Sequence, residues 1–93
     1  MATEASGKPH LDGDPLPVDL KRIFGDNLRA ARLKAGLTQA ELGSRVRRSQ
    51  QYISLVEVGR ENLTIDTMSM LAAIVGEDVI TMLQQQQDTA AEG

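Results

Sequence analysis

The sequence predicts an all-α fold, a compact domain of five helices. Apolar residues recur at steps of three and four in separate segments, which is the spacing of one face of a helix. Ser, Thr or Asp stands before these segments and a glycine follows most of them, as expected of helix caps and helix ends. The chain has 93 residues and no cysteine, so we expect one small domain held together by apolar packing.

Two segments without an apolar period flank the expected domain. Residues 1–17 carry glycines and prolines among polar residues, and we predict that they form a flexible arm. Residues 18–84 are predicted to form the folded domain, and residues 85–93 a C-terminal tail. The only histidine, His10, lies in the arm without other ligands at metal spacing. The sequence therefore predicts no metal site and no cofactor.

The first two helices are predicted from their ends and from the spacing between apolar residues. The first begins after Asp19, a candidate N-cap, and ends at Gly36. Residues 38–41 read Thr-Gln-Ala-Glu, which fits a capping box, so a second helix is expected over about 39–46. The inward residues expected of the first helix are Leu20, Phe24, Leu28, Ala31 and Ala35.

The third helix is expected to be short. Ser49 is its candidate cap, Ile53 and Val56 form its inward stripe, and Gly59 ends it. Gly43, in the second helix, has no side chain, so the third helix can cross the second closely at this point. The two helices are therefore predicted to pack against each other.

The last two helices are predicted to start at Thr64 and Asp78, both candidate caps. Gly76 stops the first of them, and the second follows at once as a short segment with closely spaced apolar residues. The inward residues expected of the pair are Ile65, Met68, Leu71, Ala72 and Val75, then Val79, Met82 and Leu83.

Charge is distributed unevenly along the chain, although the net charge is only -3. Residues 28–60 hold seven Lys or Arg and two Asp or Glu, whereas residues 61–93 hold six acidic residues and no basic one. The basic stretch favours contact with a polyanion, and the alternative is a solvated charged surface. The sequence starts without the pattern of a secretion signal and contains no run of 18 apolar residues, so we expect a cytoplasmic protein that does not span a membrane.

The segments "GLTQAELGSRV", "SQQYIS" and "LTIDTMSMLAAIVGEDVITML" resemble the Cro/repressor-type (XRE-like) helix-turn-helix DNA-binding family over about residues 23–83. The resemblance implies a five-helix domain of lambda-repressor-like type, in which the second and third helices form the helix-turn-helix. Two residues depart from the family pattern. Arg47 replaces the usual glycine of the turn, and Arg48 replaces an apolar residue. The turn is therefore either strained at Arg47, with both arginines contacting phosphates, or slightly longer with solvated arginines.

The third helix is predicted to read DNA bases. With Ile53 inward, its outward positions and its N-terminal end place five residues toward a major groove: Ser49, Gln50, Gln51, Ser54 and Leu55. A glutamine side chain pairs with adenine through one donor and one acceptor, and Leu55 can pack on a thymine methyl. Phosphate contacts are expected from four further residues: Gln39, Arg48, Arg60 and Asn62. The alternative for each residue is exposed polar or apolar surface.

Two structural contacts complete the prediction. The family resemblance implies an ion pair between Arg32 and Glu57, which would join the first and third helices. The last helix has more apolar positions than one core-facing stripe requires, so Val79, Ile80 and Leu83 are predicted at a homodimer interface.

These observations predict sequence-specific binding of double-stranded DNA by a transcriptional repressor that acts as a homodimer on a palindromic operator. The alternative is an antitoxin-like or other protein-binding module, in which the acidic C-terminal third or the arm engages a protein partner and DNA binding is secondary. An enzyme is not expected, because the sequence lacks a nucleophile with its base, a metal cluster and a phosphate-binding glycine loop.

Overall fold

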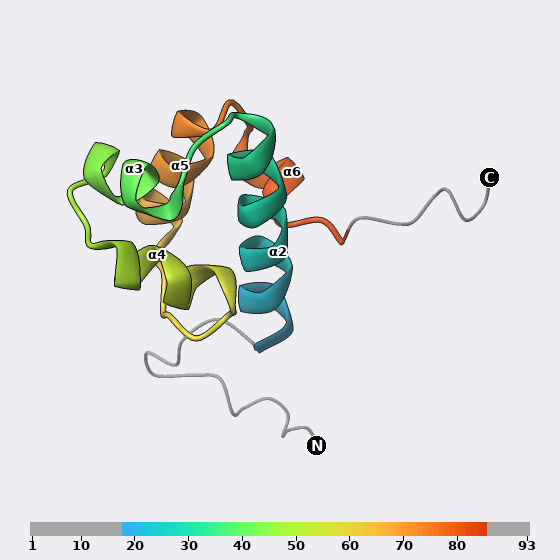
Figure 1. The fold of residues 1–93 in the computed structure, drawn as a ribbon. Helices are drawn as coiled ribbons and strands as arrows, with labels where there is room; N and C mark the ends of the chain where they lie inside the picture. The colour runs from blue at the N-terminus through green and yellow to red at the C-terminus, as the bar shows by residue number, and fades with distance from the viewer. Residues whose placement is uncertain (1–17, 86–93) are drawn as a thin grey trace, which may run out of the picture.

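The computed structural model describes residues 18–85, which form five α-helices and no strand. Figure 1 shows α3 and α4 on one side of the domain and α2 and α6 on the other. The predicted all-α architecture is confirmed for this part of the chain. The arm expected at residues 1–17 and residues 86–93 of the expected tail lie outside the described residues. The helices are α2 (Val18–Lys34), α3 (Gln39–Arg45), α4 (Gln50–Glu57), α5 (Ile65–Ile74) and α6 (Val79–Met82).

Four helices begin at the caps that the sequence predicts. In each, a side-chain oxygen accepts a hydrogen bond from a backbone N–H of the first turn, which has no partner inside the helix. α2 differs, because it begins at Val18 and therefore already contains Asp19, which is not its N-cap. The four observed caps are Thr38 of α3, Ser49 of α4, Thr64 of α5 and Asp78 of α6.

Helices α2 to α5 end in the same way. Beyond each C-cap one residue has a positive φ, and the N–H of the next residue donates to a carbonyl of the last turn. That residue is glycine after α2, α4 and α5, but it is Arg47 after α3, with φ of 59°. The helix-turn-helix therefore keeps a tight turn at residues 46–49, and the longer turn that the sequence left open is not formed. A side chain in this conformation costs about 1 kcal/mol.

The core contains apolar side chains from all five helices. Most predicted inward residues are buried, among them Phe24, Leu28, Ile53, Met68 and Leu71. The prediction was wrong for one residue after α2 and for one at the start of α5. Ala35 is exposed as the cap residue after α2, and Ile65 is 57% exposed at the first position of α5. Leu63, in the loop before α5, is buried instead.

Two glycines allow close contact around α4. A Cβ on Gly43 would lie 2.7 Å from the carbonyl oxygen of Arg48, so α3 lies directly against the turn that leads into α4, as predicted. A Cβ on Gly25 would lie 2.4 Å from the carbonyl oxygen of Val56, so α2 touches the C-terminal end of the same helix. No local sequence signal marked this contact of Gly25. Both glycines fix the position of α4 in the domain.

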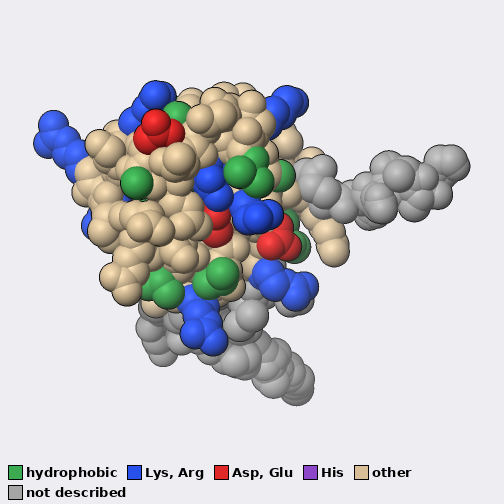
Figure 2. Space-filling model, in the orientation of Figure 1, with side chains coloured by type: hydrophobic (Ala, Val, Ile, Leu, Met, Phe, Trp, Pro, Cys, Tyr) green, Lys and Arg blue, Asp and Glu red, His purple; other side chains and the backbone are tan. Residues whose placement is uncertain are grey.

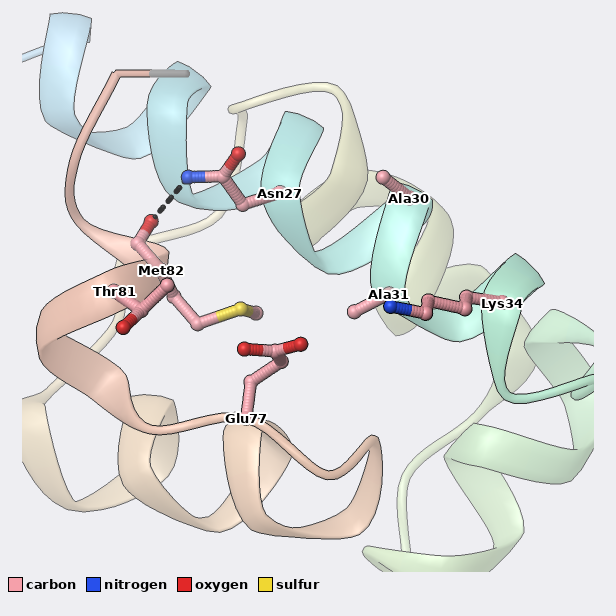
Figure 3. A pocket seen from close by; sticks show the side chains of 7 residues that line it. All are labelled: Asn27, Ala30, Ala31, Lys34, Glu77, Thr81 and Met82. Atoms are coloured by element: carbon pink, nitrogen blue, oxygen red, sulfur yellow. Dashed lines mark hydrogen bonds between the residues drawn. The ribbon is translucent and has the colours of Figure 1, made fainter. Parts of the chain in front are cut away.

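Asn27 fastens the C-terminal end of the domain to α2. Its side-chain amide donates to the carbonyl oxygens of Met82 at 2.7 Å and Gln84 at 2.9 Å, and Figure 3 shows the first of these bonds. A cavity of about 260 Å³ lies beside this contact, lined from the α2 side and the α6 side, without residues of α3 or α4. No helix within residues 18–85 is long and apolar enough to cross a membrane.

Candidate nucleic-acid interface

α4 is anchored to the domain by one face and exposed on the other. Ile53, Val56 and Glu57 are buried, whereas Gln50 and Gln51 are exposed at the N-terminal end of the helix. Ser54 is half-buried, and Leu55 and Val58 leave 36% and 58% of their surface exposed toward the C-terminal end. The exposed face is thus polar at the start of α4 and apolar at its end. Val58, the C-cap of α4, belongs to this exposed surface as well.

The ion pair implied by the family resemblance is present and buried. Arg32 Nε donates to Glu57 Oε2 at 2.6 Å and Arg32 Nη2 donates to Glu57 Oε1 at 3.1 Å. The two side chains retain only 8% and 2% of their surface. Arg32 Nη1 also donates to the carbonyl oxygen of Leu37 at 2.9 Å, and the hydrogen bond to Glu57 raises the pKa of Arg32. This contact joins α2, the α2–α3 loop and α4.

Hydrogen bonds extend from the ion pair to the surface of α4. Gln39 Nε2 donates to Glu57 Oε1 at 3.0 Å, and Gln50 Nε2 donates to Gln39 Oε1 at 3.0 Å. A carboxylate only accepts hydrogen bonds, so Gln39 must present its NH₂ group to Glu57 and its oxygen to Gln50. Gln50 must then present its own NH₂ group to Gln39. Its oxygen and one N–H are left for another partner.

Each remaining base-reading candidate has a distinct environment. Ser49 Oγ accepts the backbone N–H of Tyr52 at 3.0 Å, so the hydroxyl caps α4 and keeps its proton and one lone pair for further bonds. Gln51 points outward beside Gln50. Ser54 is partly covered, and Leu55 offers apolar surface without a donor or acceptor.

The predicted phosphate-contact residues lie around the two ends of α4. Arg48 is exposed immediately before the cap, and Arg60 is exposed in the loop after the helix. Asn62 accepts a hydrogen bond from Lys21 Nζ at 2.9 Å through its side-chain oxygen, which adds a cation from α2 that the sequence analysis missed. Gln39 begins α3, where the backbone N–H groups of the first turn attract anions. Lys and Arg side chains are spread over the face drawn in Figure 2, where Asp and Glu are sparse.

The residues predicted at the dimer interface are not equally available. α6 is a single turn of four residues, and Leu83 follows it as the C-cap. Val79 and Leu83 are half-buried against the core, whereas Ile80 is 65% exposed. Of the three, only Ile80 presents most of its side chain to solvent.

A short helix, a tight turn and a second helix with an exposed polar N-terminal end form a helix-turn-helix, which presents its second helix to the major groove of DNA. A family model described as a helix-turn-helix domain matches residues 23–80. The chain therefore belongs to the helix-turn-helix family of DNA-binding transcription regulators.

Individual proteins are similar to this chain in sequence or in fold. The chain is 35% identical over 72 residues to the uncharacterized HTH-type transcriptional regulator y4dJ of Sinorhizobium fredii, an alignment that covers 77% of this chain and 94% of that protein. The structure of the present chain is similar to that of the clp gene regulator ClgR from Corynebacterium glutamicum. The TM-score is 0.65 and the identity 30%, over 69% of this chain and 68% of that one. A hypothetical transcription factor, NHTF, from Neisseria shares the fold with a TM-score of 0.70 and 24% identity, over 89% of this chain and 97% of that one.

Proposed function

We propose that this protein is a transcriptional repressor that binds a palindromic operator in double-stranded DNA as a homodimer, in the cytoplasm. α4 enters the major groove with its N-terminal end foremost, and Gln50 and Gln51 contact base edges. Ser49 and Ser54 supply further hydrogen-bonding groups, and Leu55 packs on a thymine methyl group.

The hydrogen-bond chain from Arg32 to Gln50 is the observation that supports this proposal best. It runs from a buried ion pair to an exposed side chain and fixes which atoms Gln50 presents to solvent. One acceptor and one donor side by side match N6 and N7 of adenine. A glutamine that only filled the surface would gain nothing from such a fixed orientation.

Phosphate contacts at both ends of α4 hold the helix in the groove. Arg48 lies before the helix, and Arg60 and Asn62 lie after it, so the same helix is bracketed by groups that bind the DNA backbone. The N-terminus of α3, with Gln39, adds backbone N–H groups for a further phosphate. These contacts set the register of the protein on DNA without selecting a sequence.

A second copy of the chain doubles the number of base pairs that are read. One short helix contacts only a few base pairs, which is too little information to select an operator. Ile80 is the residue that we place at the centre of the contact between the two copies, because it is exposed on α6.

Substitutions at the two classes of contact test the proposal. Gln51→Ala should relax the preference at one or two base pairs of each half-site, because a bidentate contact contributes roughly 1–3 kcal/mol of discrimination. Arg60→Ala should instead weaken binding to all duplexes alike and reduce the slope of log K against log salt by about one unit. Titrations of single-mismatch duplexes at several salt concentrations measure both effects.

Gln39→Ala supplies a matched control for the hydrogen-bond chain. Without Gln39, the amide of Gln50 can rotate, so preference at the base pair read by Gln50 should weaken although Gln50 itself is unchanged.

A mismatch scan in which the Gln51→Ala variant shows the wild-type preferences would refute the assignment of Gln51 as a base-reading residue.

A further inference from the structure

The proposed function uses Arg48 as a phosphate contact but gives no role to its contact with Tyr52. The guanidinium carbon of Arg48 lies 4.8 Å from the centre of the Tyr52 ring, within the range of a cation–π interaction. Tyr52 is half-buried in the first turn of α4 and packs against the core, whereas Arg48 is exposed in the turn before this helix. The ring, fixed by its packing, therefore supports the guanidinium of an exposed side chain.

Over residues 20–85, whose side chains are described, Arg48 has no carboxylate partner. The ion pair in this part of the chain is that of Arg32 with Glu57. A guanidinium that rests on a ring face can still direct its in-plane N–H groups to a phosphate. Arg48 also stands at the end of α4 where Ser49 and Gln50 lie, next to the edge of the proposed groove contact.

We propose that Tyr52 is a positioning residue for DNA binding, which holds the guanidinium of Arg48 ready to contact a backbone phosphate beside the N-terminal end of α4. The inference rests on the proposed function, because it requires that this end of α4 approach DNA. A flexible side chain loses conformational entropy when it becomes fixed on binding, and this loss weakens association. Tyr52 fixes the side chain of Arg48 in the free protein, so less entropy is lost when DNA binds.

A double-mutant cycle on a mixed-sequence 20-bp duplex tests the coupling, since a phosphate contact does not depend on sequence. Arg48→Ala should weaken binding and reduce the salt slope by about one unit. Tyr52→Leu should weaken binding roughly two- to five-fold, the effect of a surface cation–π contact. In the Arg48→Ala background, Tyr52→Leu should have no further effect.

Tyr52→Phe separates the ring from its hydroxyl group. The ring face is retained, so this variant should bind like the wild type. Weaker binding by Tyr52→Phe would show that the hydroxyl itself contacts DNA and would overturn the proposal. An equal loss of DNA affinity on Tyr52→Leu in the presence and in the absence of Arg48 would also overturn it, because the substitution would then act by damaging the fold. Melting curves of all variants identify such damage.

A measurement without DNA keeps the two proposals apart. Tyr52 is the only tyrosine and the chain has no tryptophan, so absorbance during an alkaline titration reports this phenol alone. Burial raises the pKa of Tyr52, the positive charge of Arg48 lowers it, and Glu61 raises it. Arg48→Gln should therefore raise the pKa of Tyr52 further. This test keeps Tyr52 and so does not depend on the folding of the Tyr52→Leu variant. An unchanged pKa would show that Arg48 does not contact the Tyr52 ring and would overturn the inference. A raised pKa in a protein that binds no duplex would instead contradict the proposed function, and the pair would then be a structural contact only.

Discussion

At the scale of single residues, Glu57 joins three helices and, in the proposed function, supports the base-reading residue Gln50 through Gln39. Its carboxylate accepts hydrogen bonds from Arg32 and from Gln39, so one buried side chain joins α2, α3 and α4. The sequence resemblance predicts the pair with Arg32. The link from Glu57 through Gln39 to Gln50 could not be predicted, because it depends on how side chains of α3 and α4 meet in space.

Glu57→Ala should lower the free energy of unfolding by about 3–5 kcal/mol, because it leaves the guanidinium of Arg32 buried without its counter-charge. Thermal melting measures the loss. Glu61→Ala removes the same charge from the nearby loop, where the side chain is partly exposed, and should change stability by less than about 1 kcal/mol. Equal melting temperatures for Glu57→Ala and the wild type would show that the pair contributes nothing.

Arg47 combines a strained backbone with a positive charge. Arg47→Gly should raise the free energy of unfolding by about 1 kcal/mol, because glycine adopts a positive φ without steric cost. Arg47→Ala removes the same charge but keeps the strain, so it should not stabilise the protein. If the charge of Arg47 contributes to DNA binding, both variants should bind a mixed-sequence duplex more weakly and to the same extent. A stabilised Arg47→Ala variant would contradict this explanation.

At the scale of helices, caps and termini were largely predictable because they depend on local residue types. Thr38, Ser49, Thr64 and Asp78 all cap the expected helices. Predictions failed where distant packing decides the outcome. Ile65 has the right spacing for the core, but Leu63 fills that end of it.

Gly25 was not predictable for the same reason, because only its close contact with α4 explains why glycine stands at this position of α2. In an isolated helix Gly25→Ala would be favourable by about 1 kcal/mol. Here the new Cβ would lie 2.4 Å from the carbonyl oxygen of Val56, which is backbone and cannot move aside cheaply. The variant should therefore be destabilised by about 1–3 kcal/mol. Asp26→Ala, at the next and exposed position of α2, is the control and should be close to neutral in chemical denaturation. A Gly25→Ala protein more stable than the wild type would refute the close contact.

At the scale of the whole molecule, basic and acidic residues occupy different parts of the chain. The basic stretch of the sequence includes α3 and α4, whereas residues 61–85 hold four acidic residues and no Lys or Arg. The sequence predicted this division, but it overestimated how much of α6 is available to a second copy.

The proposed dimer can be tested with two matched isoleucines. Ile80→Asp should convert the protein to a monomer in light scattering and weaken operator binding, because it places a charge in the proposed interface. Ile65→Asp changes a similarly exposed isoleucine, 57% against 65%, at the start of α5, and should leave the dimer intact. A wild-type monomer that binds a single half-site at full affinity would exclude the proposed assembly.

The central claim is that the exposed N-terminal end of α4 reads a base sequence. Selection of duplexes from a random pool, with the wild type and with the Gln50→Ala/Gln51→Ala double variant, tests it most directly. The wild type should enrich a palindrome whose half-sites lie about 10–10.5 bp apart, centre to centre. The double variant should retain salt-dependent binding but lose the preference at the central positions of each half-site. Enrichment of the same sequence by both proteins, or of no sequence by the wild type, would contradict the claim.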